Sequence, residues 1–163
     1  KTVIYRMFIC ISDIGTVGFT FFFSFCFETF LHQASHYKES GKLYQWHKLH
    51  HKDYPAKRLE SDVFLYTTGW LNNMFGFYIL LSQLFIYLVS SSRVFTIFYI
   101  QTTGYAFSVE YMHQQYHLKN SWWLRYKWFR RLKQNHLLHH IKHHKNYGMF
   151  TNVIDKLNRS FQE

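Results

Sequence analysis

The sequence has little cysteine, little proline and few acidic side chains. Its only two cysteines, Cys10 and Cys26, lie in apolar sequence and form no C-x-x-C pair, which excludes a disulfide framework and a cysteine zinc finger. Nine Asp and Glu stand against nineteen Lys and Arg, and 22% of the residues are aromatic. A chain that is both basic and aromatic is typical of a protein that spans a membrane and meets water at a positive face.

The length of 163 residues fits one domain, so we expect a single domain over residues 1–163. The sequence begins at Lys1 without a methionine. We therefore expect a fragment that lacks its N-terminus, and no signal peptide can be judged.

Three apolar stretches are each long enough to cross a bilayer, which takes roughly 20 mostly apolar residues. They are residues 7–31, 63–89 and 94–112, and Asp13 is the weak point of the first. The alternative is three buried helices of a soluble bundle. The stretches lack a polar face that recurs at the helical period, which favours the membrane. The sequence therefore predicts an all-α integral membrane protein with about three spans.

Positive charge predicts how these spans are oriented. Residues 32–62 carry six Lys or Arg and residues 113–163 carry ten, whereas the rest of the chain carries Lys1, Arg6 and Arg93. The positive-inside rule places both long polar segments in the cytoplasm, where we expect them to form a helical cap. We expect the membrane to be the endoplasmic reticulum in a eukaryote or the inner membrane in a bacterium.

Residues 118–133 interleave five aromatic rings with six basic side chains. This pattern can indicate nucleic-acid binding. Beside three apolar stretches it favours an interfacial helix that contacts anionic lipid. We therefore predict no nucleic-acid partner.

All twelve histidines lie in the two positive segments, in four clusters. Residues at i, i+3 and i+4 share one face of a helix, so each cluster aims its imidazoles in one direction. The chain crosses the membrane twice between His51 and His113, which returns it to the same side. The clusters are His32-x-x-x-His36, His47-x-x-His50-His51, His113-x-x-x-His117, and five histidines between 136 and 144.

The last cluster, in "NHLLHHIKHHKNYG" (135–148), contains two overlapping triplets of the same form. One is His136, His139 and His140, and the other is His140, His143 and His144. Helix geometry alone does not choose between them. If Gly148 ends the helix, as glycine often does, the later triplet would lie in a fraying turn, which favours the earlier one.

Ten clustered imidazoles exceed the needs of one metal ion, because zinc takes about four ligands. They predict two ions, each with four or five nitrogens and an open position. Imidazole suits iron, copper, zinc and nickel, and iron is expected if the chemistry is oxidative, although zinc could replace it in purified protein. Two alternative functions fit a histidine-rich membrane protein. One is a metal transporter or sensor, although a transporter places its metal ligands near the bilayer midplane, and the other is a scaffold protein that binds the metals but catalyses no reaction.

These clusters resemble the fatty acid hydroxylase and sterol desaturase superfamily of integral-membrane di-iron oxygenases. The resemblance covers Glu28 to Gly148, and "LYQWHKLHHKDYP" (43–55) and "GYAFSVEYMHQQYH" (104–117) are similar to its second and third histidine boxes. "LKQNHLLHH" (132–140) and its spacing to Asn146-Tyr147-Gly148 are similar to the fourth. The resemblance implies these metal ligands: His32, His36, His47, His50, His51, His113, His117, His136, His139 and His140.

The same resemblance implies the activity, which is oxidation of a lipid C–H bond by two iron ions and dioxygen. A fatty-acyl or sphingolipid chain is the first choice of substrate and a sterol the second. Gln33, where many members have Arg, leaves the substrate class in doubt. No cytochrome-like domain is present, so we expect an external electron-donor protein as a partner, with the lipid substrate entering from the bilayer.

Two carboxylates and one further histidine complete the expected site. Glu28 lies four residues before His32 and Glu110 three before His113. Each is expected to accept a hydrogen bond from a ligand imidazole and so to orient it. His143 is expected next to the ligands rather than among them.

Overall fold

The computed structural model describes residues 2–63 and 74–162. Within these ranges the chain is helical, and the only β-type pairing is an isolated bridge between Ser61 and Leu118. The prediction of an all-α fold is confirmed. The helices are α1 (Thr2–Ala34), η1 (Lys38–Ser40), α2 (Lys42–Asp53), α3 (Met74–Val89), α4 (Ser92–His117), η3 (Trp122–Arg125), α5 (Lys127–Ile141) and α6 (Val153–Leu157).

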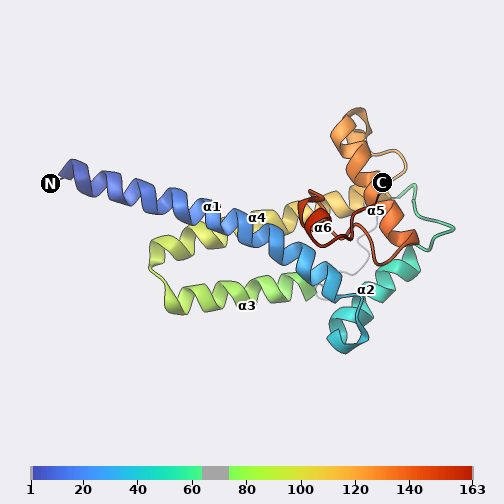
Figure 1. Ribbon diagram of the computed structural model, residues 1–163, viewed down its shortest axis with the longest axis horizontal. Coiled ribbons are helices and arrows are strands. Elements are labelled where there is room, and N and C mark those ends of the chain that lie inside the picture. The colour runs from blue at the N-terminus through green and yellow to red at the C-terminus, as the bar shows by residue number, and fades with distance from the viewer. Residues whose placement is uncertain (1, 64–73, 163) are drawn as a thin grey trace.

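Three long helices form an elongated bundle, and the others gather at one end of it. Figure 1 shows α1 beside α4, and α3 and α4 as an antiparallel pair joined by a turn at the end far from α2, α5 and α6. The C-terminal ends of α1 and α4 therefore both point into the cap made by α2, α5 and α6. These are the ends at which the first and third histidine clusters lie.

The interior of the bundle combines aromatic contacts with hydroxyl groups that are satisfied locally. The rings of Phe23 on α1 and Phe98 on α4 lie 5.4 Å apart. The buried hydroxyls of Thr20 and Ser24 each donate to a carbonyl one turn earlier, at 2.7 and 2.8 Å. Small side chains of this kind let two helices approach closely and leave no polar group unpaired, as helix packing in a membrane requires.

The outer faces of the bundle are apolar and exposed. Many neighbouring exposed apolar side chains of this kind mark a surface that contacts a membrane or a partner. Ser12–Ala34 is long and apolar enough to cross a membrane, and Gly76–Val89 is a shorter apolar helix. The second expected span, 63–89, falls partly on residues 64–73, which lie outside the described residues. Exposed apolar residues include Ile14, Phe21, Phe22, Leu84, Leu88, Ile100 and Phe107.

Asp13, the weak point of the first apolar stretch, has a charged partner. The guanidinium of Arg93, at the start of α4, donates through Nε to Asp13 Oδ1 at 2.8 Å and through a second nitrogen to Oδ2. Both ions therefore lie together near the α3–α4 turn, far from the cap (Figure 1). The ion pair with Arg93 lowers the cost of placing the Asp13 carboxylate in an apolar helix, whereas an isolated carboxylate there would be costly.

The cap is held to the bundle by a small apolar core at the C-terminal half of α4. Tyr116 and Phe129 are fully buried and their rings lie 5.3 Å apart, which joins α4 to α5. The hydroxyl of Tyr116 donates to the carbonyl of Met149 at 2.7 Å. Met149, itself buried, brings the segment after α5 into the same core.

Candidate metal centre

The structure brings the ten expected ligands together in the cap, nine of them in two adjoining groups. Within each group, one nitrogen or oxygen ligand atom of every member lies within 4.8 Å of those of the others. The five-histidine group is His50, His113, His117, His136 and His140. The four-histidine group is His32, His36, His47 and His139.

His51 lies between the two groups. Its Nε2 is 2.9 Å from Nε2 of His47, in the four-histidine group. Its ring centroid is 4.2 Å from that of His140, in the five-histidine group. The imidazole of His51 can therefore serve as a ligand with either group of histidines, or lie between the two groups.

Two helices contribute to both groups, which is why the groups adjoin. α2 places His47 in one group and His50 in the other, with ring centroids 5.8 Å apart. α5 likewise divides His139 from His140, at 5.9 Å. The spacing i, i+3, i+4 thus presents one helix face to two metal positions rather than to one.

Four of the imidazoles are oriented by backbone carbonyls. A carbonyl only accepts, so each Nδ1 carries the hydrogen and each Nε2 keeps its lone pair. The bonds run from Nδ1 of His32 to Tyr147 O (2.5 Å), of His117 to Leu59 O (2.7 Å), of His139 to Lys145 O (2.7 Å) and of His140 to Tyr54 O (2.9 Å). Metal-binding histidines characteristically donate their other ring nitrogen in this way.

The Nε2 atoms converge at distances that suit a shared cation. Nε2 of His50 is 2.9 Å from that of His113 and 3.0 Å from that of His140. In the other group, Nε2 of His36 is 2.9 Å from that of His47 and 3.1 Å from that of His139. Two nitrogens bound to one ion at about 2.0–2.1 Å and at right angles lie about 2.9 Å apart.

In the four-histidine group, one buried ring nitrogen lacks a hydrogen-bond partner among the described residues. This nitrogen is Nε2 of His32. Leaving a buried polar atom unpaired costs roughly 1–3 kcal/mol, which a bound cation would remove. The donor set, which is all imidazole, fits a transition metal in each group.

Burial keeps these imidazoles neutral. Burial and then neighbouring imidazoles lower the pKa of His117 to about 3 and that of His140 to about 2. The pKa of His50, His113 and His136 also lies well below the ordinary value, again mainly because of burial. Protons therefore do not compete with metal at neutral pH.

The geometry separates the two overlapping triplets. His136, His139 and His140 are buried on α5 and belong to the two groups. The expectation that the helix continues to Gly148 was wrong, because α5 ends at Ile141. His143 and His144 follow that end and are exposed.

His143 nevertheless lies beside the ligands, as expected. Its Nε2 donates to His140 O at 3.0 Å, and its ring is 4.5 Å from that of His51. His144 belongs to neither group of imidazoles in the described chain.

Glu28 and Glu110 do not have the partners that we expected. Buried Glu28 accepts from the backbone N–H of Met149 at 3.2 Å and from the hydroxyl of Tyr105 at 3.4 Å. Glu110 accepts from Gln114 Nε2 at 3.2 Å. Within the described residues, neither carboxylate bonds an imidazole. The backbone carbonyls orient the ligands instead.

Sequence reasoning missed Asp155, which fixes the carbonyl that holds His32. Its buried carboxylate accepts from the backbone N–H of Tyr147 and of Gly148, each at 2.8 Å, and from Ser160 Oγ at 2.7 Å. A Cβ at Gly148 would lie 2.0 Å from Thr151 O, so this turn requires glycine. The only signal in the sequence was an acidic residue within the short apolar run "VIDKL" (153–157).

Comparison with protein families identifies one match. The family model described as fatty acid hydroxylase matches residues 16–160, which include all ten expected ligands and Asp155. No curated protein and no solved structure matches the chain significantly.

Substitutions in the last cluster test the ligand assignment. Purified protein should hold about two transition-metal ions per chain, because ten imidazoles exceed the needs of one ion. His136→Ala should lose the ion of the five-histidine group, whereas the matched change His144→Ala should retain both. Elemental analysis measures the counts. If His144→Ala loses a metal and His136→Ala does not, the ligands are His140, His143 and His144.

Asp155→Asn should lower the metal affinity of the four-histidine group and leave that of the five-histidine group unchanged. The amide cannot accept from both N–H groups, so the carbonyl of Tyr147 should shift and metal affinity there should fall about ten- to a hundredfold. Competition with a chelator, followed by metal counts, measures this change. Asp62→Asn, at an exposed site, is the control and should change nothing. If Asp155→Asn lowers the metal affinity of both groups equally, Asp155 does not act by orienting His32.

Proposed function

The chain belongs to the fatty acid hydroxylase family, whose members are membrane-associated oxidoreductases, and from this premise we propose that it oxidises a lipid C–H bond with dioxygen at two metal ions. The observation that carries the proposal is the convergence of ten imidazoles at the end of an apolar helical bundle, nine of them in two adjoining groups and His51 between the groups. Hydroxylation of a fatty-acyl or sphingolipid chain is the first candidate, and oxidation or desaturation of a sterol is the alternative in the same superfamily.

We propose iron as the metal in both groups. Bound iron supplies the redox chemistry that activates dioxygen, which zinc does not, although zinc could replace it in purified protein. The residues of the chain position and shield the site. Tyr54, only 3% exposed, stacks on the ring of His117 at 3.8 Å and gives its carbonyl to His140. Such fixed, dry surroundings are what a protein contributes to cofactor chemistry.

We propose that α1, α3 and α4 carry the three membrane spans, and that the last turns of α1 and α4, which hold His32, His113 and His117, extend beyond the bilayer. Their exposed apolar faces support this placement, and so does the pairing of polar groups inside the bundle. Gln83 on α3 donates through Nε2 to Thr102 and Thr103 on α4, at 2.9 Å each. The polar residues thus face one another rather than lipid, as they do inside membrane proteins.

This placement puts the histidines at one membrane face and not between the spans. The cap lies beyond the ends of α1 and α4, and the α3–α4 turn lies at the other end (Figure 1). Transporters bind their cargo near the midplane, so the arrangement favours an enzyme over a metal transporter. The basic cap should face the cytoplasm, at the endoplasmic reticulum or at a bacterial inner membrane.

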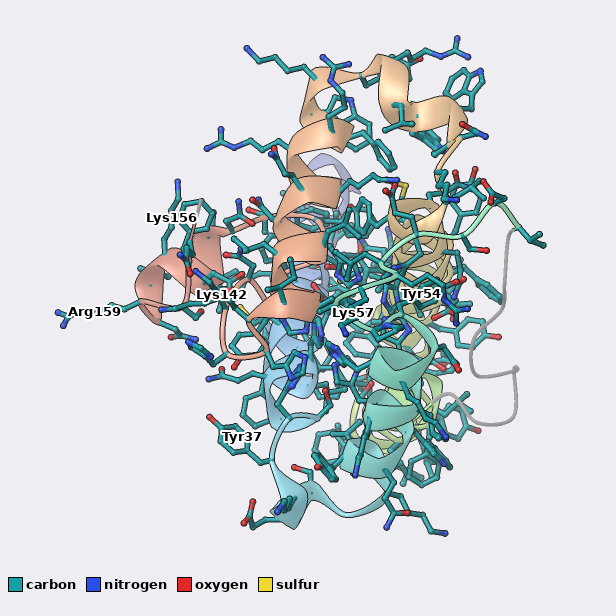
Figure 2. The ribbon with its side chains drawn as sticks, turned by 90° about the vertical axis from the view of Figure 1, so that its right-hand side faces the viewer. Tyr37, Tyr54, Lys57, Lys142, Lys156 and Arg159 are labelled. Atoms are coloured by element: carbon teal, nitrogen blue, oxygen red, sulfur yellow. The ribbon has the colours of Figure 1, made fainter. Side chains whose placement is uncertain are left out.

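Substrate and electrons should reach the site from different sides. A lipid chain would lie along the apolar bundle, with its reactive carbon at the level of the cap. Figure 2 views the cap end and shows Lys57 and Lys142 there, and both side chains are exposed. This basic surface suits an acidic electron-donor protein, because opposite charges steer association.

Lipid profiles test the activity. Expression of the chain with a suitable electron donor, under dioxygen, should produce lipids one oxygen heavier, or lighter by two hydrogens if it desaturates. His136→Ala should abolish the products and His144→Ala should retain much of the activity. Mass spectrometry of total lipids with ¹⁸O₂ measures incorporation. Unchanged lipids in cells that hold metal-loaded wild-type protein would count against an oxygenase.

Labelling of single cysteines tests the topology. In a background without Cys10 and Cys26, cysteines at exposed positions Lys57 and Lys119 should react from one side of sealed vesicles and a cysteine at Ser91 from the other. The reason is that α3 and α4 form a hairpin across the bilayer. An impermeant maleimide applied outside, and then after permeabilisation, measures sidedness. If position 91 labels with the other two, the hairpin does not span the membrane.

A further inference from the structure

Lys133 on α5 places a buried cation in the cap. Among the residues whose side chains the structure describes, it is the only lysine or arginine that is buried, at 6% exposed. A lysine is almost never buried unless its charge is paired, because removing an ammonium ion from water is costly. The contacts of this ammonium group should therefore account for its position.

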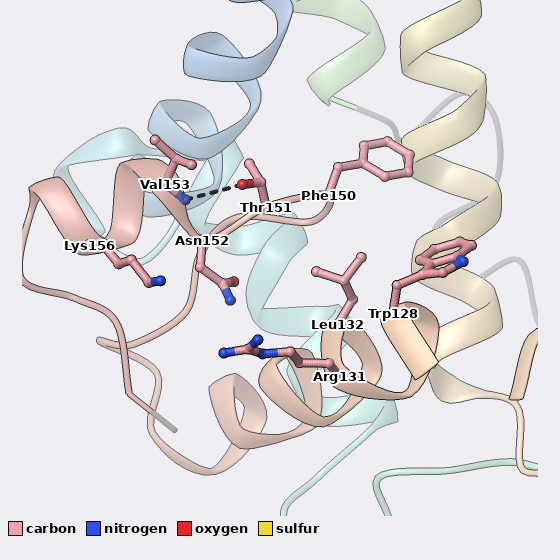
Figure 3. Close-up of a pocket in the computed structure, with 8 residues that line it drawn as sticks. All are labelled: Trp128, Arg131, Leu132, Phe150, Thr151, Asn152, Val153 and Lys156. Atoms are coloured by element: carbon pink, nitrogen blue, oxygen red, sulfur yellow. Dashed lines mark hydrogen bonds between the residues drawn. The ribbon is translucent and has the colours of Figure 1, made fainter. Parts of the chain in front are cut away.

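Lys133 lies on the same face of α5 as two ligands. One face of the helix, with Trp128 and Leu132, lines a depression beside the segment before α6 (Figure 3). The other face is buried and carries His136 and His140 of the five-histidine group. Lys133 precedes His136 by three residues and so shares this buried face.

The ammonium of Lys133 joins two segments of the chain that meet beside His117. Its Nζ donates to the carbonyl of Leu118 at 2.6 Å and lies 2.6 Å from Oε1 of Glu60. These two residues directly follow the partners of a bond that orients a ligand, which runs from His117 Nδ1 to Leu59 O at 2.7 Å. Lys133 is thus bound one residue beyond each end of that bond.

The same two segments are also paired through their backbones. The N–H of Ser61 donates to His117 O at 2.7 Å, and the N–H of Lys119 donates to Ser61 O at 2.9 Å. These bonds form the isolated bridge between Ser61 and Leu118. The ion pair with Lys133 attaches the bridged segments to α5 as well.

The segment that contains Glu60 serves the five-histidine group. Tyr54 and Leu59 give their carbonyls to two imidazoles of this group. The four-histidine group instead receives carbonyls from Lys145 and Tyr147, which follow α5. The two groups are therefore oriented by different segments, so a change at Lys133 should affect one group and not the other.

We propose that Lys133 is a positioning residue of the five-histidine group. It holds Glu60 and Leu118 in place. The carbonyl of Leu59 therefore stays where it accepts from His117, and Nε2 of that ring remains 2.9 Å from Nε2 of His136. The inference rests on the proposed metal centre and is independent of the oxidation chemistry and of the lipid.

The charge of Lys133 alone predicts the opposite effect on the metal. A cation near a bound dication repels it, so removing the ammonium without moving the ligands would raise metal affinity. Loss of a group that orients a ligand instead lowers metal affinity, typically about ten- to a hundredfold. The direction of the change in Lys133→Met therefore separates positioning from charge.

Competition with a chelator tests this proposal on the intact chain, loaded with cobalt(II) in detergent. The visible absorption of cobalt depends on the arrangement of its ligands, and His117→Ala and His32→Ala assign the bands to the two groups. Lys133→Met should lower the cobalt affinity of the five-histidine group about ten- to a hundredfold and shift its bands. The affinity and bands of the four-histidine group should not change, which also reports that the cap is folded.

An exposed ion pair on the same two segments provides the matched control. Nζ of Lys119 lies 2.9 Å from Oδ2 of Asp62, and at least half of each side chain is exposed. Lys119→Met removes the same charge as Lys133→Met and should leave the cobalt affinity of both groups unchanged.

Three outcomes would overturn the proposal. The first is an unchanged or higher cobalt affinity of the five-histidine group in Lys133→Met, and the second is an equal loss in Lys119→Met. The third is loss of cobalt from both groups, because Lys133 would then hold the cap as a whole. A wild-type chain that binds no cobalt would contradict the metal centre itself, whereas an absence of lipid oxidation would leave all these readings unchanged.

Discussion

The structure depends on how the buried imidazoles of the centre are oriented. Four of them donate Nδ1–H to a backbone carbonyl, whereas Nδ1 of His50, His51 and His136 has no hydrogen-bond partner among the described residues. A neutral imidazole has one donor and one lone pair, and burial makes either costly if unmet. Backbone carbonyls satisfy the donors of four ligands, and they come from loops rather than helices. Tyr54 and Leu59 follow α2, and Lys145 and Tyr147 follow α5. The helices therefore supply the metal-facing nitrogens, while the loops fix the tautomer and the direction of each ring.

The segment Asn146–Met149 carries much of this orientation, and two buried carboxylates hold it. Glu28 binds the N–H of Met149 from α1, and Asp155 binds the N–H groups of Tyr147 and Gly148 from α6. Two dications among neutral ligands would bring uncompensated charge into the buried centre. The carboxylate of Asp155, which holds the peptide whose carbonyl accepts from His32, would offset part of that charge while leaving the metal-facing positions to nitrogen.

Apolar length in the sequence predicted the helices of the bundle, and histidine spacing predicted the convergence of four clusters. The convergence follows from side-chain direction along a helix, which spacing encodes. The choice of the earlier triplet in the last cluster came from the family resemblance and from a helix end expected at Gly148. The end of α5 at Ile141 and the partners of Glu28 could not be predicted this way. Lys142 and His143 are not helix breakers, so the sequence carries no local signal for this end; in the structure the segment beyond it supplies Lys145 O and Tyr147 O as acceptors for two imidazoles. Asp155 lies far along the chain from the histidine that it serves, so no local pattern identifies it.

The position of the centre at the end of the bundle reconciles two requirements. Lipid hydrocarbon is confined to the bilayer, and ten polar imidazoles with two charged ions would be costly inside it. In the proposed membrane placement, His32, His113 and His117 at the C-terminal ends of α1 and α4 lie next to the apolar sequence of the bundle. Phe30, on the last turns of α1 and 65% exposed, precedes His32 by only two residues. Under the proposed function, a reactive carbon at this end of the bundle would approach the metals while the lipid chain stays in hydrocarbon and the ions stay among the imidazoles.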